Sequence, residues 1–299
     1  MAYFINIIKT PNLFGVFIFL FNYFCIKISF DMSKELIWAK ENFIKYTDYT
    51  SNDVIKIKQI HKGYTNISFL FYTSDNNKYQ VRIAGPEQIV DRVNEKNILE
   101  LIEEKNYLHY DKHGNVIKKW INGKNPTMLF KKKKIINLLL DQINILHSVN
   151  IKNANIVKHN SLSFFNLADW SGNEKHREKY LELLKSFSNI SLVLSHNDLN
   201  LDNVVYLKDK ISLIDYEWGR INYYYWDIAN FFRETNLSIK WVNYIAKIAP
   251  EYEKEILIKF IYFSTCFAFQ WTYAMHPTNK ILKYRKKIIK QMNNYTNWL

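Results

Sequence analysis

The sequence is poor in cysteine, and that scarcity excludes several kinds of protein. Among its 299 residues only Cys25 and Cys266 are cysteines. A single distant pair provides neither the disulfide framework of a small secreted domain nor the clustered spacing of a zinc site. We therefore expect the protein to work in a reducing compartment, the cytoplasm.

The sequence also lacks a nucleic-acid signature, although it is strongly basic. Its formal net charge is +13, which suits either an anionic partner, such as nucleic acid or a membrane, or a simple compositional drift. The lysines are mostly scattered, and the one dense run, residues 131–134, opens a segment with helical apolar periodicity. No RNA-binding aromatic signature or zinc spacing is present, so we favour drift and expect no nucleic-acid partner.

No apolar run reaches the roughly 20 residues that a membrane-spanning helix needs. Residues 13–26 come nearest, between Lys9 and Lys27, and no small-x-small cleavage site precedes Met32. The sequence turns polar from Met32 onward. Residues 1–31 are therefore interpreted as an apolar extension, which is either dispensable, with Met32 as the working start, or associated with a membrane.

What the chain does have is enough apolar sequence for a substantial core. Hydrophobic residues make up 48% and charged residues 23%, as in a soluble globular protein. A chain of this length forms either one large domain or two lobes.

The most informative pattern lies at residues 194–234. His196, Asp198 and Asn203 follow a short apolar run and are spaced H-x-D-x-x-x-x-N. Two further apolar runs come next, separated by a turn-like Lys-Asp-Lys, and the second run ends at Asp215. The pattern predicts a strand, a polar loop, and a β-hairpin that ends on an acidic residue.

This order of side chains suits phosphoryl transfer. Such a site needs a carboxylate to accept the proton of a hydroxyl group and oxygen ligands for a metal that neutralises phosphate. Asp198 fits the first role, and Asn203 and Asp215 fit the second. His196 more naturally braces the loop than reacts. These residues could also decorate an ordinary surface turn, but a hairpin that delivers a second Asp favours the catalytic interpretation.

The N-terminal half predicts a small sheet with a phosphate-binding turn. Residues 54–62, 66–73 and 79–84 alternate as strands do. Gly63, Thr65 and Asn66 belong to the bend between the first two strands. A glycine at such a bend can close backbone N–H groups over phosphates, although an ordinary hairpin has the same pattern.

Arg82 is a cation within an apolar strand, so it requires a partner. The following helix, predicted over residues 87–105, offers Glu95, with Glu100 as the second choice. In the kinase plan, such a pair holds the cation that grips phosphate. A plain surface ion pair is the alternative.

At these residues the sequence resembles the choline/ethanolamine kinase family. This family lies within the kinase-like small-molecule phosphotransferases, the superfamily of the aminoglycoside phosphotransferases. The family carries I-D-[FY]-E-[YW], an aromatic stretch, and then D-[IL]-[AG]-N-x-F-x-E. The matching residues are Asp215, Tyr216, Glu217, Trp218, Asp227, Ile228, Ala229, Asn230, Phe232 and Glu234. A G-x-T-N turn at Gly63 and a V-R-I segment at Arg82 also match, and the resemblance spans residues 54–275.

The resemblance implies an α+β, protein-kinase-like fold. A small N-terminal lobe with an antiparallel sheet, residues 32–122, would bind nucleotide. A larger, mainly helical lobe, residues 123–299, would carry the catalytic loop and the substrate site. The implied cofactors are ATP and Mg²⁺, with Arg82 gripping phosphates beneath the glycine turn. The implied reaction is phosphorylation of choline to phosphocholine, with ethanolamine as a further substrate. A thiamine or aminoglycoside kinase, and a catalytically dead binding module, remain open, as does the oligomeric state.

The resemblance also suggests which residues meet the substrate. Glu217 is expected beside the metal or a cationic head group. Tyr223 matches a tyrosine of the family's aromatic cage, and Trp271 is expected to join it from a late helix. Rings bind a quaternary ammonium by their faces, so we expect choline to be preferred to ethanolamine. The alternative is that these rings are core. Asp227 is expected to cap the helix that it opens.

Every motif lies after Met32, which leads to a first prediction. A chain that starts at Met32 should be soluble and as active as the full chain. Gel filtration and a phosphotransfer assay on the two chains in parallel provide the check. An inactive or unfolded short chain would show that residues 1–31 belong to the catalytic fold.

Overall fold

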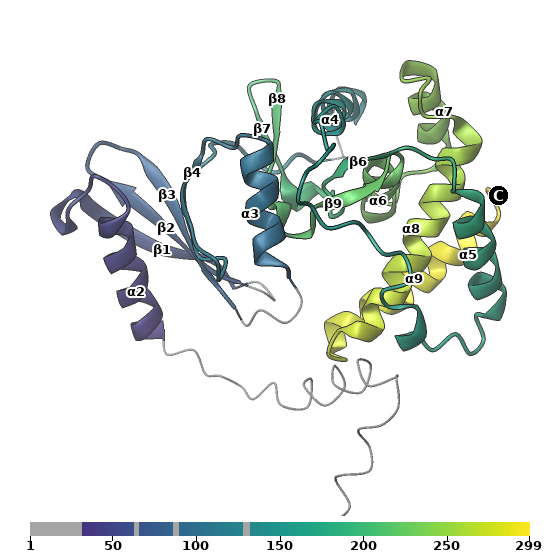
Figure 1. The fold of residues 1–299 in the computed structure, drawn as a ribbon, viewed down its shortest axis with the longest axis horizontal. Helices are drawn as coiled ribbons and strands as arrows, with labels where there is room; N and C mark the ends of the chain where they lie inside the picture. The colour runs from purple at the N-terminus through teal and green to yellow at the C-terminus, as the bar shows by residue number, and fades with distance from the viewer. Residues whose placement is uncertain (1–31, 63–65, 86–89, 128–131) are drawn as a thin grey trace, which may run out of the picture.

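The computed structural model describes residues 32–62, 66–85, 90–127 and 132–299 (Figure 1). The apolar extension and two residues of the predicted phosphate turn, Gly63 and Thr65, lie outside the described residues. Within them, the chain forms a β-rich N-terminal lobe and a larger, mainly helical C-terminal lobe. The predicted α+β arrangement is therefore confirmed.

The N-terminal lobe is built on a five-stranded antiparallel sheet in the order β1-β2-β3-β5-β4. Helix α2 lies on its outer face, and α3 lies between the sheet and the C-terminal lobe (Figure 1). The elements are α2 (Met32–Lys45), β1 (Val54–Lys62), β2 (Asn66–Thr73), β3 (Lys78–Ala84), α3 (Arg92–Leu101), β4 (Tyr107–Tyr110) and β5 (Val116–Lys119).

Strand alternation gives this sheet two different faces. One face packs its apolar side chains against Ala39 and Phe43 of α2; they are Ile67, Phe69, Phe71, Tyr79, Val81 and Ile117. The alternate residues of β2 and β3, among them Ser68 and Arg82, point to the opposite face and line a cleft. One face of the sheet therefore builds the core of the lobe, and the other is left for the site.

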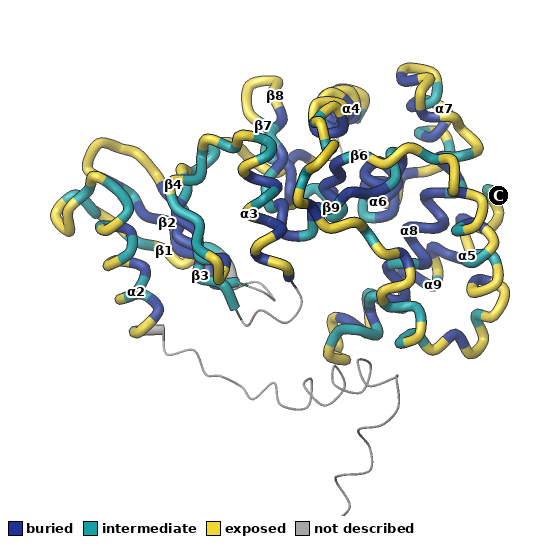
Figure 2. The backbone as a smooth tube through the Cα atoms, viewed as in Figure 1, coloured by how far each residue is buried: buried dark blue, intermediate teal, exposed yellow. Residues whose placement is uncertain are grey.

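The C-terminal lobe packs its helices around α8, whose side chains are largely buried (Figure 2). Its helices are α4 (Lys132–His147), α5 (Glu174–Ser186), α6 (Trp226–Thr235), α7 (Ile239–Ile248), α8 (Lys254–Ala274) and α9 (Asn279–Thr296). Two small antiparallel sheets carry the polar loops: β6 (Leu192–Ser195) pairs with β9 (Arg220–Tyr223), and β7 (Val204–Leu207) pairs with β8 (Lys210–Leu213).

The chain enters the C-terminal lobe just after β5, where backbone hydrogen bonds connect Lys124 with β7. Lys124 N donates to Tyr206 O at 3.1 Å, and Tyr206 N donates to Lys124 O at 2.8 Å. Gly123 has φ +143°, and a Cβ there would lie 2.5 Å from Val205 Cγ1, so the close approach requires glycine. Because Lys124 already pairs with the C-terminal lobe, we propose the lobe boundary at 122/123.

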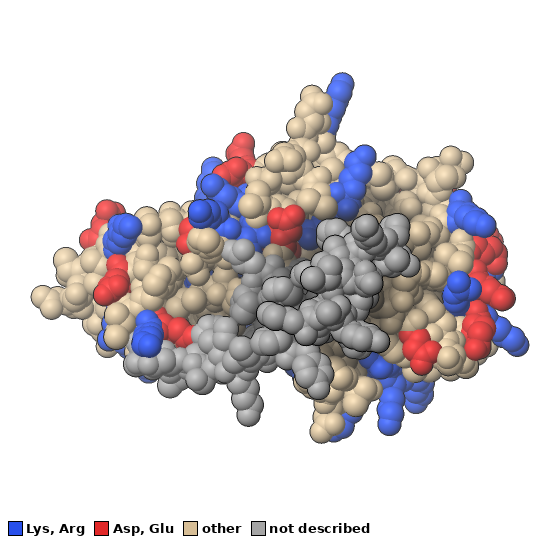
Figure 3. All heavy atoms as spheres, turned by 60° about the horizontal axis from the view of Figure 1, so that its bottom comes forward, with Lys and Arg blue, Asp and Glu red and all other residues tan. Residues whose placement is uncertain are grey.

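Two further observations on the described residues concern the distribution of charged side chains on the surface and the length and hydropathy of the helices. Lysine and arginine side chains are interspersed with acidic ones on the face shown in Figure 3, rather than gathered in one field. Among the described helices, none has both the length and the apolar character needed to cross a bilayer.

Candidate active site

A cleft of about 1320 Å³ lies where the lobes meet, and both lobes line it. The N-terminal lobe contributes Asn66, Ser68, Gln80, Arg82 and Lys118. The C-terminal lobe contributes the loop after β6, the end of β8, and parts of α6, α8 and α9. The structure thus brings most of the predicted site residues to one cavity.

The loop after β6 presents Asp198 to the cleft. Asn200 accepts hydrogen bonds from Asp202 N at 2.8 Å and Asn203 N at 3.3 Å, so its side chain shapes the turn. Asn203 Nδ2 then donates to Asp198 Oδ2 at 2.9 Å and to Asp198 O at 2.8 Å. These bonds fix the carboxylate of Asp198 beside the amide of Asn203.

Burial raises the pKa of Asp198 to about 6. The charge of His196 opposes this effect, whereas the carboxylates of Asp215 and Glu234 strengthen it. A carboxyl group with a pKa near neutrality is suited to accept a proton from a hydroxyl group.

The anchor of this loop is Asp227, which the sequence analysis assigned to a helix cap. That assignment is wrong: Asp227 is fully buried, and its carboxylate accepts hydrogen bonds from the loop. Ser195 Oγ and Asn197 N donate to Oδ1 at 2.8 and 2.9 Å, and His196 N donates to Oδ2 at 3.0 Å. His147 Nε2 adds a fourth bond at 3.1 Å, so this histidine supports the site from α4.

The β7–β8 hairpin places Asp215 next to the loop. Ile214 N donates to Asn203 O at 3.0 Å, and His196 Nε2 donates to Ile214 O at 2.9 Å. His196 is fully buried and so braces the two segments. Asp215 itself has φ +69°, a left-handed conformation that non-glycine residues rarely adopt and that often marks a functional position.

Asn203 and Asp215 form a donor set that fits Mg²⁺. The amide nitrogen of Asn203 is used by Asp198, so its amide oxygen is the atom available to a cation. Within the described ranges, no group of three His, Cys, Asp or Glu side chains could hold a metal by itself. Two protein oxygens plus phosphate oxygens and water are the usual environment of Mg²⁺ bound with a nucleotide.

Arg82 lines the cleft and forms a buried ion pair with Glu95. Its guanidinium meets Glu95 in a two-pronged arrangement, with Nη1–Oε1 at 2.8 Å and Nη2–Oε2 at 2.9 Å. Nη1 also lies 3.8 Å from Asp215 Oδ1. Burial alone would raise the pKa of Glu95, but Arg82, Tyr110 and Arg92 outweigh it and lower the pKa. The expected pair, Arg82 with Glu95, is therefore present in the structure.

Arg92 is a site residue that the sequence analysis missed. Its Nη1 donates to Glu95 Oε2 at 3.1 Å and to Glu217 Oε2 at 3.0 Å, and its Nη2 donates to Asn66 Oδ1 at 2.8 Å. Asn66 Nδ2 also donates to Glu217 Oε2 at 3.0 Å. Glu217 thus ties the two lobes together at the edge of the cleft. Burial and the nearby Asp215 raise the pKa of Glu217.

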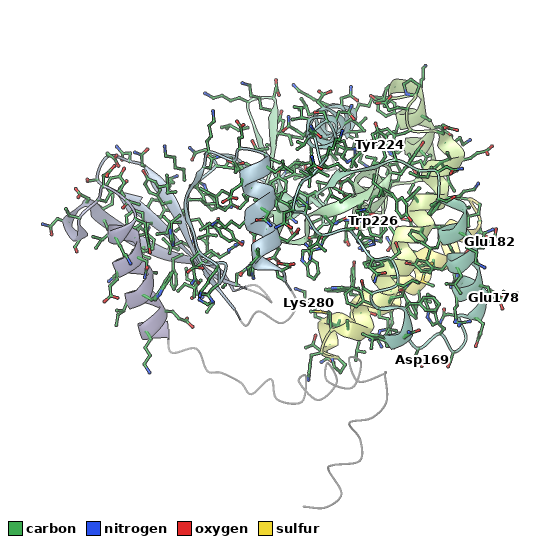
Figure 4. The ribbon with its side chains drawn as sticks, in the orientation of Figure 1. Asp169, Glu178, Glu182, Tyr224, Trp226 and Lys280 are labelled. Atoms are coloured by element: carbon green, nitrogen blue, oxygen red, sulfur yellow. The ribbon has the colours of Figure 1, made fainter. Side chains whose placement is uncertain are left out.

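The far half of the cleft has an aromatic wall. The rings that line it are Phe164, Trp218, Trp226, Phe267, Trp271 and Tyr284. Trp271, predicted from the sequence, meets Tyr284 edge-on at a centroid distance of 6.2 Å. Figure 4 shows Trp226 within the C-terminal lobe and Lys280 at the start of α9, on the side turned toward the N-terminal lobe.

Tyr223 does not belong to this wall, contrary to expectation. Its ring packs against Phe187 at 5.8 Å and Phe260 at 5.4 Å. In β9 it pairs with Leu192. The preceding residue, Asn222, faces the loop after β6, because its side-chain amide donates to Asn197 Oδ1. Strand alternation therefore turns Tyr223 toward the helices.

A carboxylate also lies in this half of the cleft. Glu234 accepts hydrogen bonds from Tyr284 at 2.7 Å and from Arg233, and Lys287 Nζ lies 3.9 Å away. Burial would raise the pKa of Glu234, but these partners lower it, so the group stays ionised. Glu234 is the final residue of the D-x-x-N-x-F-x-E segment that the sequence analysis identified, but the sequence analysis assigned it no role.

A sheet lobe, a helical lobe and a carboxylate–amide–carboxylate site between them define a protein-kinase-like phosphotransferase. A family profile described as choline/ethanolamine kinase matches residues 57–262. The chain belongs to the choline/ethanolamine kinase family.

Known proteins resemble the chain in sequence or in fold. An uncharacterized protein of Mycoplasma pneumoniae, the MG356 homolog, is 35% identical over 255 residues, covering 81% of this chain and 86% of that protein. Choline kinase LicA from Streptococcus pneumoniae has a TM-score of 0.64 at 19% identity, over 85% of this chain and 99% of LicA. Plasmodium vivax ethanolamine kinase has a TM-score of 0.60 at 18% identity, over 79% of this chain and 82% of its own. LicA with AMP and aminoglycoside phosphotransferases with GDP or ADP share the fold as well.

The Asp227 contacts predict the effect of Asp227→Asn. The amide would face backbone and side-chain donors that need an acceptor, and each unsatisfied buried donor costs about 1–3 kcal/mol. The free energy of unfolding should fall by at least that amount, and kcat should fall as well. Urea denaturation and steady-state kinetics measure the two effects.

The pH dependence provides a second check on this variant. Burial raises the pKa of Asp227, but the hydrogen bond and charge of His147 and the contacts with His196 outweigh it, so the pKa lies below the ordinary 3.8. The carboxylate therefore stabilises the fold fully above that value and loses its effect as the pH falls through the lowered pKa. The difference from wild type should shrink in acid. Asp141→Asn, at an exposed residue of α4, is the control. Equal stability of Asp227→Asn and wild type at neutral pH would contradict the anchoring role.

Proposed function

We propose that the protein transfers the γ-phosphoryl group of ATP to the hydroxyl group of choline, and also of ethanolamine, with Mg²⁺ as cofactor. The observation that carries the proposal is the convergence of Asp198, Asn203 and Asp215 on one cleft, with Arg82 3.8 Å from Asp215. Family membership supports a small-molecule kinase, and AMP bound to the related fold of LicA supports an adenine nucleotide.

Each residue has a chemical task in this proposal. Asp198 orients the substrate hydroxyl and accepts its proton, and Asn203 holds the Asp198 carboxylate at 2.9 Å. Asn203 and Asp215 would hold Mg²⁺, which shields the charge of the transferring phosphate. Arg82 would contact the phosphates, and the Glu95 pair fixes its orientation. The phosphate turn at Gly63, Thr65 and Asn66 stays a prediction of the sequence, because Gly63 and Thr65 lie outside the described residues.

The aromatic half of the cleft supports a cationic substrate. Trp271, Trp226 and Phe267 line it, and Glu234 adds an ionised carboxylate. Ring faces attract a quaternary ammonium with about 0.5–2 kcal/mol per ring. Glu217, by contrast, is engaged by Arg92 and Asn66, so we assign it to closing the lobes and not to the head group.

The second candidate is another small-molecule kinase of the superfamily, acting on thiamine or an aminoglycoside. The observation in its favour is that aminoglycoside phosphotransferases share the fold with TM-scores of 0.63 and 0.64. A substrate panel with labelled ATP separates the candidates, because only the true acceptor takes up label.

The carboxylate role of Asp198 predicts the behaviour of Asp198→Asn. The substitution keeps the shape of the side chain but removes the proton acceptor, and general-base assistance contributes about 10²–10⁴-fold. The kcat should fall within that range while ATP affinity is nearly kept, as steady-state kinetics and calorimetry can show. Turnover like that of wild type would refute the assignment.

The ring wall predicts a split between Trp271→Ala and Tyr223→Ala. Losing one ring at about 1–2 kcal/mol should raise the KM for choline about 5- to 30-fold and leave the KM for ATP unchanged. Tyr223→Ala should lower stability alone, since its ring lies against Phe187 and Phe260.

The kcat/KM for choline should also exceed that for ethanolamine. A better rate with ethanolamine, or an unchanged choline KM in Trp271→Ala, would refute the cage.

A further inference from the structure

The aromatic half of the cleft contains an ion pair between two consecutive residues of α6. Arg233 and Glu234 both line the cleft, and Arg233 Nη1 donates a hydrogen bond to Glu234 Oε1. The side chain of Arg233 is 8% exposed and that of Glu234 is 20% exposed. Glu234 is the carboxylate of this half, so its partner decides how much negative charge a substrate meets there.

Contacts from two helices hold the guanidinium of Arg233 against Glu234. Consecutive residues of a helix do not face each other, so the pair needs further support. Arg233 Nη1 also donates to the hydroxyl group of Tyr284 on α9, and Nη2 donates to Asn230 Oδ1, three residues earlier on α6. Tyr284 in turn donates to Glu234 Oε1 at 2.7 Å. The phenol of Tyr284 therefore links the two charges.

Within this pair, each charge acts most strongly on the other. Burial alone would raise the pKa of Glu234, and the charge of Arg233 is the strongest influence that opposes it. Burial alone would lower the pKa of Arg233, and the charge of Glu234 is the strongest influence that raises it. Both groups therefore stay charged, and each offsets the field of the other.

The offset extends to the reacting end of the cleft. Burial raises the pKa of Asp198, and beyond the effects of His196 and Asp215 it is raised by Glu234 and lowered by Arg233. The two members of the pair thus act on Asp198 in opposite directions.

The other charges of the aromatic half do not restore a negative field. Among the described residues of α6, α8 and α9 that line the cleft, the charged ones are two cations and one carboxylate: Arg233, Lys280 and Glu234. Figure 4 shows Lys280 at the start of α9. Lys287 Nζ adds a positive charge 3.9 Å from the second oxygen of Glu234. A cationic head group therefore gains no net attraction from the charged side chains of these three helices.

Ring contacts and shape remain as the means of holding the head group. Trp226, Phe267, Trp271 and Tyr284 line this half. Ring faces attract a cation, but they also bury the surface of any compact apolar group that fits between them. A tert-butyl group has the shape of a trimethylammonium group and carries no charge.

We propose that Arg233 is the internal counter-ion of Glu234 and makes the cleft select the acceptor by the shape of its head group more than by its charge. The protein then phosphorylates uncharged alcohols with a compact branched head, such as 3,3-dimethylbutan-1-ol, alongside choline. This inference rests on the proposed phosphotransfer and specifies which property of the acceptor alcohol the cleft selects.

The reaction is the same for both alcohols. The hydroxyl oxygen forms a bond to the γ-phosphorus of ATP, and the bond from that phosphorus to the oxygen that bridges it to the β-phosphate breaks. Asp198 takes the hydroxyl proton. The products are ADP and a phosphate monoester, so the head group takes no part in the bonds that change.

The alternative role for Arg233 is purely structural. Its backbone carbonyl accepts a hydrogen bond from Gln291 Nε2 at 2.7 Å, and its side chain reaches Tyr284, so the residue also ties α6 to α9. An arginine that only joins these helices would affect both alcohols equally when it is replaced. The ratio between the two alcohols therefore distinguishes the roles.

The test compares the kcat/KM for choline with that for 3,3-dimethylbutan-1-ol at fixed ATP and Mg²⁺. We expect wild type to phosphorylate both and to favour choline by no more than about 30-fold, the preference that one or two ring faces supply. In Arg233→Met, measured at alkaline pH so that Glu234 stays ionised, the uncompensated carboxylate should widen this ratio about 10- to 100-fold.

Two further variants serve as controls. Because breaking one side of a buried ion pair is destabilising, the double variant Arg233→Met/Glu234→Gln removes both charges and should return the ratio to its wild-type value. This variant also covers the case that Arg233→Met folds poorly. Lys283→Met removes a cation from an exposed residue of α9 outside the cleft and should leave the ratio unchanged.

The outcomes separate the inference from the function on which it rests. A larger preference for choline in wild type, or choline turnover with no turnover of the uncharged alcohol, would overturn the inference alone. Equal ratios in wild type and a folded Arg233→Met would overturn it as well, as would a double variant whose ratio departs from wild type. If a folded chain that binds ATP phosphorylates neither alcohol, the proposed phosphotransfer itself fails.

Discussion

The site depends on one buried carboxylate. Asp227 has no exposed surface, and its two oxygens accept hydrogen bonds from Ser195, Asn197, His196 and His147. A buried charge is stable only when it is fully hydrogen-bonded, so the backbone of the loop after β6 cannot move without leaving the Asp227 carboxylate unsatisfied. The position of Asp198 follows from this constraint, because Asp198 comes directly after the residues that Asp227 holds.

A second buried charge network relates the lobes to each other. Glu95 meets both Arg82 and Arg92, and Arg92 reaches Glu217 across the cleft. Breaking such a pair leaves an uncompensated buried charge at a cost of about 3–5 kcal/mol, whereas its net effect on stability is small. Its clearest effect is on geometry: it holds the guanidinium of Arg82 next to Asp215.

The sequence predicted the elements that depend on local pattern. Strand alternation located β1, β2 and β3, and the spacing of His196, Asp198, Asn203 and Asp215 located the loop and the hairpin, whereas the arrangement in two lobes followed from the family resemblance. Glu95 was predicted as the partner of Arg82 because a cation in an apolar strand has few possible partners. Contacts between segments that are distant in the sequence were not predicted. Arg92 looks like a surface residue at the start of a helix, and only folding brings it to Glu217, 125 positions away. Tyr223 was misplaced because an aromatic run does not reveal which ring faces the cleft, whereas its register with Leu192 does.

The central claim is that the cleft between the lobes catalyses phosphoryl transfer to a small alcohol. The most direct measurement is ³¹P NMR of the purified chain with ATP, Mg²⁺ and choline. The account predicts a phosphocholine resonance that grows in step with ADP while the γ-phosphate signal of ATP declines. No phosphorylated product with choline, ethanolamine, thiamine or an aminoglycoside, from a folded chain that binds ATP, would contradict it.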